Sequence, residues 1–419
     1  MKHAVFLLLA LLALAPACGP GAPYTGAYTG MTDAAAATGG RGGDGSGGGA
    51  GVTPGGAPGA GGSGGASATG TGGGTGDSAA RDAGGGKETT GGTGGRPGDG
   101  GTDPGTTARC PATPRCDAAA PDPGAARPWR HKAPSGAANH RGRDLFVNPG
   151  ARQWILGDFH YGLALLESAL ADEEVDVYLL RGCGATWEKL GSALTTSTAA
   201  HETVEGVSDA PGRFYFEIPA AKALAAGRHR VRLVVGGDLS TVDLFIEVVP
   251  AGTPLFVTDV DGTLTTSEDA QTLALLTGAM PEANADAAQA LTLLAAKGYR
   301  PLYLTARPEW LARTTQDWLA AKGFPPGVIH TTLTSAGASG AAAGTYKTDD
   351  LKLLAGKGLK PAFAFGNTST DADAYNNAGV QPLGNRIFFQ YTDSAWNGRR
   401  IEAFQPLLSE FAALPLVCP

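Results

Sequence analysis

The chain has 419 residues, of which 42% are hydrophobic, and it carries a formal net charge of −7 at pH 7. An acidic balance of this kind offers no basic surface to a phosphate backbone, so nucleic-acid binding is excluded. The length could accommodate about three domains. Much of the excess among the 65 glycines lies in one stretch near the N-terminus, however, which leaves room for fewer folded regions.

The first 18 residues have the features of an export signal. Met1–His3 is basic, Ala4–Leu14 is apolar but too short to span a bilayer, and Ala15–Ala17 supplies small residues for cleavage. Cys18 stands where a bacterial lipoprotein carries its lipid-modified cysteine. We therefore expect residues 1–18 to be a signal peptide with a lipobox, and the exported protein to be attached peripherally to a membrane through Cys18. The alternative is a secreted protein without the lipid.

Residues 19–135 predict a disordered linker. They are rich in Gly, Ala, Thr, Ser and Pro and contain almost no aromatic side chains. Such a segment cannot bury enough apolar surface to offset the entropy that ordering would cost. No later segment is long and apolar enough to cross a membrane, so any attachment depends on the N-terminus.

Four cysteines remain beyond Cys18. In an exported protein an even set suggests disulfides, and four cysteines allow three connectivities. Because Cys110 and Cys116 flank a short Pro-containing loop, we expect a local bond between them, which leaves Cys183 to pair with Cys418. A zinc site is the alternative, but the chain has only 7 histidines and none at ligand spacing near these cysteines.

Residues 140–250 contain short runs in which apolar and polar residues alternate, such as Val175–Leu179, Arg213–Ile218 and Thr241–Val248. A period of two with intervening turns predicts antiparallel strands that have one solvated face. Several such strands within about a hundred residues predict an all-β, Ig-like sandwich. Nothing in this region has a catalytic pattern, so we expect it to support the rest of the protein or to contact a surface or partner.

From residue 253 to 419, helical and strand patterns alternate, which predicts a Rossmann-like α/β domain with a parallel sheet covered by helices. The predicted strands are 255–258, 301–304, 328–331, 362–365 and 386–390, and the predicted helices are 283–297 and 308–322. The segments between the motifs are too short for an inserted cap domain. We therefore expect a capless domain with an open site.

The strand at 255–258 is apolar without alternation and runs directly into Asp259, Val260 and Asp261. Open α/β sheets build their sites at the carboxyl ends of strands, and two Asp one residue apart suit a nucleophile and an acid/base beside Mg²⁺. Gly262 permits a tight turn. A calcium loop is excluded because its glycine would be sixth and its twelfth residue Glu. A solvated acidic turn would not account for the buried strand.

Other polar residues follow later strands. Thr305 and Arg307 could hold phosphoryl oxygens, although Thr305 could also cap a helix and Arg307 could be a surface charge. Asn367 and Asp371 offer the hard oxygen ligands that Mg²⁺ prefers. Lys347 on its own would be read as an ordinary exposed lysine. The order in which these residues follow successive strands is more specific than any one of them.

With these motifs, the chain resembles the haloacid dehalogenase superfamily, and within it the lipin-type catalytic domain, over about residues 255–391. The resemblance rests on Asp259–Thr265, Leu302–Arg307, Lys347 and, above all, Phe365–Tyr375 followed by Arg386–Phe388. Related domains in phosphatidylinositol-transfer proteins can lack the nucleophile. Asp259 and Asp261 are both present here, which favours an active enzyme.

The resemblance implies a role for each residue. Asp259 would attack phosphorus to form an aspartyl-phosphate, and Asp261 would protonate the leaving oxygen and then activate water. Thr305 and Lys347 would hold the phosphoryl oxygens. Further residues that the resemblance assigns to substrate contact are Arg307 and Gly262, and those assigned to Mg²⁺ are Asp259, Asp261, Asp371 and Asn367.

The sequence thus predicts an exported, Mg²⁺-dependent phosphatase that hydrolyses a phosphate monoester. An open site accepts a phosphate presented by a large body, which favours a phosphatidate-like phospholipid as substrate. One alternative is a catalytically silent module on the same fold that binds a lipid or another surface, and another is a phosphotransferase or phosphonate-type hydrolase on the same scaffold.

Overall fold

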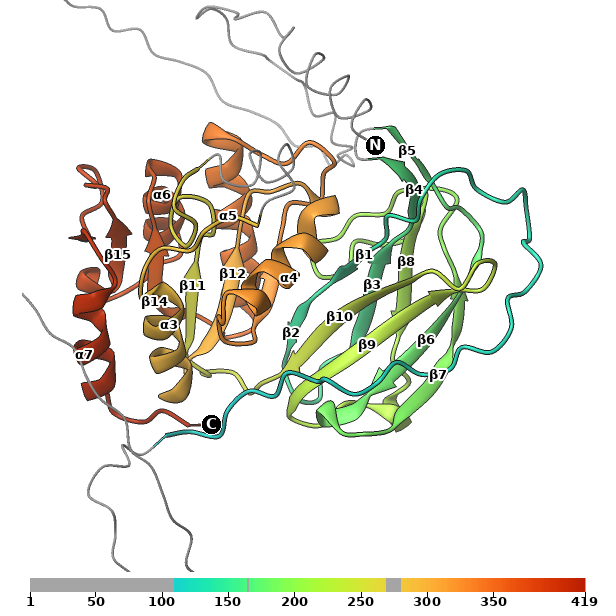
Figure 1. The fold of residues 1–419 in the computed structure, drawn as a ribbon, viewed down its shortest axis with the longest axis horizontal. Helices are drawn as coiled ribbons and strands as arrows, with labels where there is room; N and C mark the ends of the chain where they lie inside the picture. Colours follow the sequence, from blue (N-terminus) through green and yellow to red (C-terminus); the bar gives the residue numbers. More distant parts are fainter. Residues whose placement is uncertain (1–108, 164–165, 269–279, 419) are drawn as a thin grey trace, which may run out of the picture. The chain divides into compact units, whose positions relative to one another are not determined.

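The computed structural model describes residues 109–163, 166–268 and 280–418, which form a β-sandwich domain followed by an α/β domain (Figure 1). The predicted fold class is therefore confirmed. The predicted signal peptide, Cys18 and the linker up to residue 108 lie outside the described residues. Within the described part of the chain, no helix combines the length and the apolar character needed to cross a bilayer.

Residues 109–135, which we placed in the linker, belong to the folded unit. This segment contains no helix or strand, yet Cys110 and Cys116 are buried in it. The backbone nitrogen of Cys110 donates to the carbonyl of Ala296 in the α/β domain. Further along, the Ala119 carbonyl accepts from the indole of Trp187 in the sandwich. The segment therefore contacts both domains.

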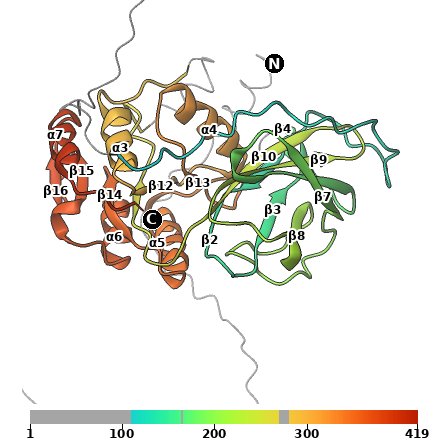
Figure 2. The same cartoon turned by 90° about the horizontal axis from the view of Figure 1, so that it is seen from below.

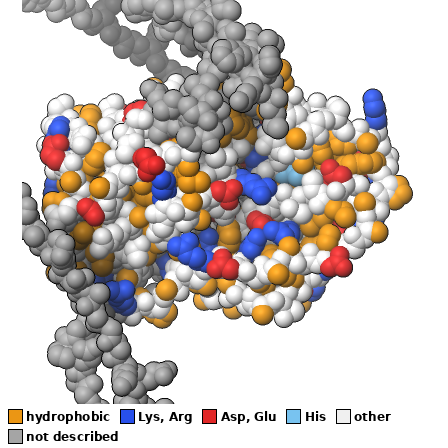
Figure 3. Space-filling model, viewed as in Figure 1, with side chains coloured by type: hydrophobic (Ala, Val, Ile, Leu, Met, Phe, Trp, Pro, Cys, Tyr) orange, Lys and Arg blue, Asp and Glu red, His pale blue; other side chains and the backbone are white. Residues whose placement is uncertain are grey.

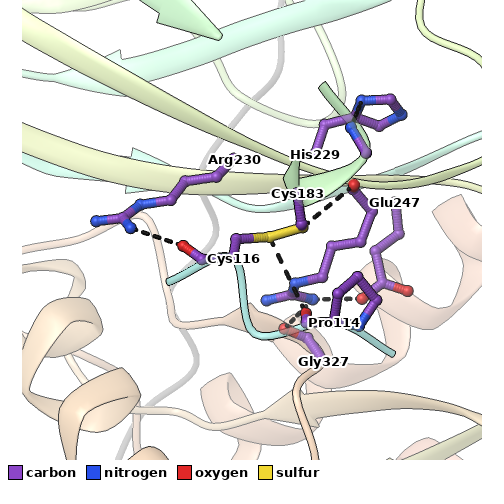
Figure 4. Close-up of a disulfide and its surroundings, with 9 residues drawn as sticks. Pro114, Cys116, Cys183, His229, Arg230, Glu247 and Gly327 are labelled. Atoms are coloured by element: carbon purple, nitrogen blue, oxygen red, sulfur yellow. Dashed lines mark hydrogen bonds and ion pairs between the residues drawn. A yellow bond between two sulfur atoms is a disulfide. The ribbon is translucent and has the colours of Figure 1, made fainter. Parts of the chain in front are cut away.

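The predicted disulfide pairings are wrong. The structure joins Cys110 to Cys418 and Cys116 to Cys183, across sequence separations of 308 and 67 residues. Cys116 packs with Leu180 and Phe245 of the sandwich, and Arg230 donates to its carbonyl (Figure 4). Prolines at 111 and 114 favour an extended backbone, which carries the two neighbouring cysteines to different domains instead of folding them together.

The described residues of the sandwich form ten strands. They are β1 (Arg141–Arg143), β2 (Leu145–Val147), β3 (Trp154–Asp158), β4 (His160–Leu163), β5 (Leu166–Ala169), β6 (Glu174–Leu180), β7 (Trp187–Leu194), β8 (Arg213–Glu217), β9 (Gly227–Val235) and β10 (Thr241–Val248). One sheet has the order β2-β10-β9-β6-β7, another has the order β1-β3-β8, and β4 and β5 form a separate hairpin. All neighbours are antiparallel except β2 and β10. Short 3-10 turns lie at Arg181–Cys183 and Ala220–Lys222.

Strand β9 shows how alternation builds this domain. Val231, Leu233 and Val235 face the core between the sheets, and the same face of β10 contributes Val242, Leu244, Ile246 and Val248. The intervening arginines of β9 lie on the opposite face of the sheet, as the period of two requires. One face of the strand thus supplies apolar burial and the other supplies charge.

The α/β domain has a six-stranded, all-parallel sheet in the order β13-β12-β11-β14-β15-β16. Its strands are β11 (Leu255–Thr258), β12 (Arg300–Leu304), β13 (Val328–His330), β14 (Pro361–Gly366), β15 (Arg386–Phe389) and β16 (Arg399–Ile401). Its helices are α3 (Ala287–Ala296), α4 (Ala312–Ala321), α5 (Gly340–Gly356), α6 (Ser369–Asn377) and α7 (Gln405–Ala413), with 3-10 turns η3 (Glu309–Leu311) and η4 (Leu383–Asn385).

Helices cover both faces of this sheet (Figure 2). On one face, Leu291 of α3, Trp318 of α4 and Phe411 of α7 share a core with the sheet. On the other face, Leu351 of α5 and Tyr375 of α6 do the same. The continuous apolar run of β11 follows from this burial on both sides. Strand β11 lies in the middle, between β12 and β14, where the strand order reverses and such sheets form their sites.

The segment between residues 308 and 346 is fully described and contains only η3, α4, β13 and the start of α5. No cap domain is inserted within it. On the face of the protein seen in Figure 3, acidic and basic side chains are interspersed, and neither sign forms a continuous patch.

Candidate active site

The two aspartates after β11 lie at the carboxyl edge of the sheet. The backbone nitrogen of Asp259 donates to the Phe365 carbonyl of β14, which fixes the chain as it leaves the strand. Gly262 has a φ of 71°, and a Cβ there would collide with the side chains of Asn367 and Glu268. The positive φ favours glycine in the turn after Asp261, and a larger residue would also displace the ends of these two side chains.

Lys347 connects the first and last motifs. It comes from α5, is buried, and donates hydrogen bonds of 2.6 Å each to Asp259 Oδ1 and Asp371 Oδ1. Burial disfavours its charge, but the two carboxylates outweigh that effect and raise the Lys347 pKa above its ordinary value. A buried ammonium held between two carboxylates is a costly arrangement unless all three groups are fixed. This is the feature expected of a site that handles negative charge.

Asp261 is bound by the second motif. Arg307 donates to both of its oxygens, from Nε to Oδ2 at 2.8 Å and from Nη2 to Oδ1 at 2.7 Å. Thr305 Oγ1 lies 3.3 Å from Asp261 Oδ2. The Arg307 Nη1 atom donates to Thr315 of α4 at 2.9 Å, so the guanidinium is held from behind. Arg307 is buried, which rules out the alternative of a surface charge.

Asp371 also fixes the start of α6. Its Oδ2 atom accepts from the backbone nitrogens of Asn367 and Thr368 and from the Thr368 hydroxyl, while Thr368 caps the helix. The capping box leaves Oδ1 pointing at Lys347. Asn367 Oδ1 accepts from Thr263 at 2.8 Å, and its amide nitrogen donates to Glu268.

The electrostatic balance of this cluster is negative. Burial, aided by the nearby charges of Asp371 and Asp261, raises the pKa of Asp259 to about 7 although Lys347 opposes the shift. When all are ionised, the four carboxylates of the cluster exceed its two cations by two negative charges. The carboxylates are Asp259, Asp261, Glu268 and Asp371, and the cations are Lys347 and Arg307.

A divalent cation with oxygen ligands fits this cluster in both charge and chemistry. Among the residues that the structure describes, Asp259 Oδ2 has a single long contact, at 3.5 Å from the Thr263 hydroxyl, so this oxygen can still accept a ligand. Within the described residues, no three His, Cys, Asp or Glu side chains by themselves converge as a metal site. Lys347 is hydrogen-bonded to two of the carboxylates, and Arg307 is hydrogen-bonded to a third.

All residues that the sequence predicted for the site lie together at this edge, although their catalytic and metal-binding roles stay predictions. Sequence reasoning missed the contributions of Thr263 and Glu268. Thr263 could have been found, because it stands in the same Asp-x-Asp-Gly-Thr run as the aspartates. Glu268 carries no such signal, since only the fold brings it to Asn367.

Comparison with known proteins relates both domains to one group. Residues 256–389 match the model of the PITM 1-3 LNS2 domain, and residues 138–248 match the model of the PITM 1-3 β-sandwich domain. The α/β domain is therefore an LNS2 domain with a haloacid dehalogenase-like fold, preceded by a PITM-type β-sandwich. The predicted superfamily is confirmed at this level.

Whole-protein relatives agree with the domain matches. The chain is 31% identical over 247 residues to protein retinal degeneration B of Drosophila melanogaster, covering 58% of this chain and 18% of that protein. It is 29% identical to membrane-associated phosphatidylinositol transfer protein 2 of Mus musculus, covering 59% and 17%, respectively. The chain thus spans less than a fifth of the length of these relatives. A crystal structure titled as a HAD-like phosphatase from Mesorhizobium loti aligns at 14% identity with a TM-score of 0.29, a similarity too low to support an argument.

Proposed function

We propose that this protein is an exported, Mg²⁺-dependent phosphatase that hydrolyses a phosphate monoester through an aspartyl-phosphate. The observation that carries the proposal is Lys347, which joins Asp259 to Asp371 by two hydrogen bonds of 2.6 Å. A purely structural lysine would not need to be buried between two carboxylates at the switch point of the sheet.

The chemistry follows from these positions. Asp259 attacks phosphorus and the leaving oxygen departs, which forms the aspartyl-phosphate. Asp261 gives a proton to that oxygen and later takes one from the water that hydrolyses the intermediate. Lys347 and Thr305 hold the phosphoryl oxygens. Bound Mg²⁺, with Asp259, Asp261, Asn367 and Asp371 as its proposed ligands, would offset the negative charge of the transferring group.

Asp261 can act only when Arg307 releases it. A substrate phosphate entering the site can accept two parallel hydrogen bonds from the guanidinium, as a carboxylate does, and competes with Asp261 for Arg307. Arg307 then passes from Asp261 to the phosphate, and the freed carboxyl turns to the leaving oxygen. This exchange couples substrate binding to the release of the acid/base.

The proposed substrate class is a phospholipid with a terminal phosphate monoester. The relatives are named as membrane-associated phosphatidylinositol transfer proteins, which connects the domain pair with phospholipid. We further propose export, with peripheral membrane attachment through Cys18. The two disulfides support export, because such bonds persist in oxidising compartments.

A second candidate function is a catalytically silent module that binds a lipid headgroup. It is favoured by one observation: both oxygens of Asp261 are engaged by Arg307, as in a resting structural ion pair. In that case phosphate would bind at the guanidinium without turnover.

One assay separates the two candidates. Inorganic phosphate release would be measured with and without Mg²⁺ from phosphatidate in mixed micelles, from glycerol phosphate and from an aryl phosphate, using wild type and Asp259→Asn. The phosphatase proposal expects Mg²⁺-dependent release by wild type only, with phosphatidate preferred to glycerol phosphate. Binding of phosphatidate micelles without any release would instead establish the silent module.

A further inference from the structure

Two arginines of the β-sandwich bind the α/β domain close to the Lys347 and Arg307 motifs. Arg143 belongs to β1 and Arg213 to β8, and both are buried. Each binds one carboxylate and one backbone carbonyl of the other domain. The bound carboxylates are close in sequence to residues of the proposed site: Asp350 follows Lys347 by three residues, and Glu309 follows Arg307 by two.

Arg143 contacts the helix that carries Lys347. Its Nη2 donates to Asp350 Oδ1 at 2.9 Å, and Asp350 lies three residues after Lys347 on α5. Its Nη1 donates to the Thr331 carbonyl at 2.9 Å, which also accepts from the hydroxyl of Tyr346 at 2.6 Å. Arg143 is therefore linked to both neighbours of Lys347 on α5: to Tyr346 through the shared Thr331 carbonyl, and to Asp350 directly.

Asp350 is fixed on its other side as well. His330 at the end of β13 lies 2.7 Å from Asp350 Oδ2 through Nδ1, and its Nε2 lies 2.9 Å from the carbonyl of Asp144 in the sandwich. Burial works against the Asp350 charge, but His330 and Arg143 outweigh it and lower the Asp350 pKa. The carboxylate therefore stays ionised and keeps α5 attached to β1.

Arg213 contacts the second motif instead. It donates to both oxygens of Glu309, at 2.7 and 3.0 Å, and to the Leu333 carbonyl at 3.2 Å. Glu309 is two residues after Arg307, and the Arg307 carbonyl accepts from the backbone nitrogen and the hydroxyl of Thr332. Arg213 therefore holds both segments that fix the backbone of Arg307.

A third interface arginine provides a natural contrast. Arg228 is buried to the same degree as Arg143, pairs with Glu247 and donates to the carbonyl of Gly327 at 3.1 Å. Gly327 directly precedes β13, at the end of the strand opposite to the motifs, and lies with Glu247 beside the disulfide (Figure 4). The same interface thus has an arginine contact at each end of β13.

We propose that Arg143 and Arg213 are positioning residues for the α/β site, so that the β-sandwich is part of the catalytic architecture. Arg143 acts on Lys347 through Asp350, and Arg213 acts on Arg307 through Glu309. The expected effect on catalysis rests on the proposed phosphatase activity. The claim that the two arginines fix α5 and the Arg307 segment does not depend on that activity.

The test compares Arg143→Met, Arg143→Lys and Arg213→Met with Arg228→Met as the matched control, all in the full chain. Hydrogen exchange of α5 and of residues 305–309 is measured together with kcat, KM and thermal stability. Arg143→Met is expected to speed exchange in α5 and to lower kcat at least tenfold with little change in KM, because Lys347 contacts the nucleophile. Arg143→Lys is expected to recover part of the loss.

Arg213→Met is expected to speed exchange at residues 305–309 and mainly to raise KM, because Arg307 binds the incoming phosphate. Arg228→Met is expected to lower thermal stability while leaving kcat and KM within about twofold of wild type. Unchanged exchange in α5 of Arg143→Met and at residues 305–309 of Arg213→Met would overturn the proposal, as would equal kinetic losses in Arg143→Met, Arg213→Met and Arg228→Met. If wild type releases no phosphate, the phosphatase proposal fails, and the exchange data alone decide whether Arg143 and Arg213 fix α5 and residues 305–309.

Discussion

Arg307 donates to both carboxylate oxygens of Asp261, at 2.8 and 2.7 Å, so the proposed acid/base is held by the residue that the sequence assigned to the substrate. The pair joins the loop after β11 to the loop after β12. In the proposed mechanism, Arg307 leaves Asp261 to bind the substrate phosphate. The kinetics of variants at this pair therefore report directly on the proposed exchange.

Replacing Arg307 by Gln should lower kcat/KM for phosphate monoesters by about 10- to 100-fold, since charge-assisted hydrogen bonds contribute about 1.5–3 kcal/mol. Most of the loss should appear in KM, because the guanidinium binds the phosphate. Steady-state kinetics with glycerol phosphate and phosphatidate measure this. Arg313→Gln, an exposed arginine on α4 whose ion-pair partner is Asp317, is the control and should have no effect. A wild-type KM in Arg307→Gln would contradict the exchange.

Replacing Asp259 by Asn should stabilise the metal-free protein at pH 8. Burial raises the pKa of Asp259 to about 7, above its value in the unfolded chain, so the folded state loses stability as pH rises from about 4 to 7. Asn mimics the protonated carboxyl, and the expected gain is about 2–4 kcal/mol at pH 8, shrinking toward pH 4.5. Urea unfolding at both pH values measures it. A variant less stable than wild type at pH 8 would show that the Asp259 charge is fully compensated by Lys347.

Mg²⁺ should raise the melting temperature of wild type and have a smaller effect on Asp259→Asn, because ligand binding to the folded state stabilises it in proportion to ln(1 + [Mg²⁺]/Kd). Ca²⁺ at the same concentration controls for general ionic effects. Equal shifts in both proteins would place any cation elsewhere than beside Asp259.

Asp350→Asn should make stability less dependent on pH in the acid range. The pKa of Asp350 is lowered by His330 and Arg143 despite burial, so its contribution is complete above about pH 4 and is lost as pH falls through the lowered pKa. The stability difference between wild type and Asp350→Asn should therefore be largest near neutral pH and narrow below pH 4. Denaturant unfolding across this range measures it. A constant difference would mean that the Asp350 charge adds nothing to the fold.

Non-reducing peptide mapping should find Cys110 bound to Cys418 and Cys116 bound to Cys183. The second bond closes a loop of 67 residues, for which chain entropy gives a stabilisation of about 4 kcal/mol. Cys183→Ser should therefore lower the melting temperature by several degrees, whereas reduction should have little further effect at that site. Detection of a bond between Cys110 and Cys116 would contradict the structure and support the pairing that spacing alone suggested.

Sequence patterns predicted the elements that burial dictates most strongly. Strands such as β11 and β14 have apolar runs that fit only a sheet covered on both faces, and their carboxyl ends located the site. Helix α5 was not assigned because it begins and ends at a glycine, contains a third at Gly344, and has no marked apolar period. It is nonetheless held in place by Lys347, Asp350 and Leu351, whose partners lie far away in the chain.

Long-range pairs were the part that sequence could not supply. The disulfide partners depend on the path of residues 109–135, and spacing alone favoured the wrong pair. The ion pair between Arg307 and Asp261 depends on side-chain directions that a motif does not contain. Arg213 stands at the start of a predicted alternating run and Arg143 lies outside every predicted strand, so neither carried a signal, and only the packing of the two domains buries them against Asp350 and Glu309.

The central claim is that Asp259 is the nucleophile, and the most direct measurement is acid quenching during turnover followed by mass spectrometry of the peptide that contains it. Wild type with Mg²⁺ and substrate should carry one phosphoryl group on Asp259, and the group should be absent from Asp259→Asn. Asp261→Asn should accumulate it, because the water that hydrolyses the intermediate then lacks its base. Phosphate release without a phosphoryl group on Asp259, or with the group on another residue, would contradict the account.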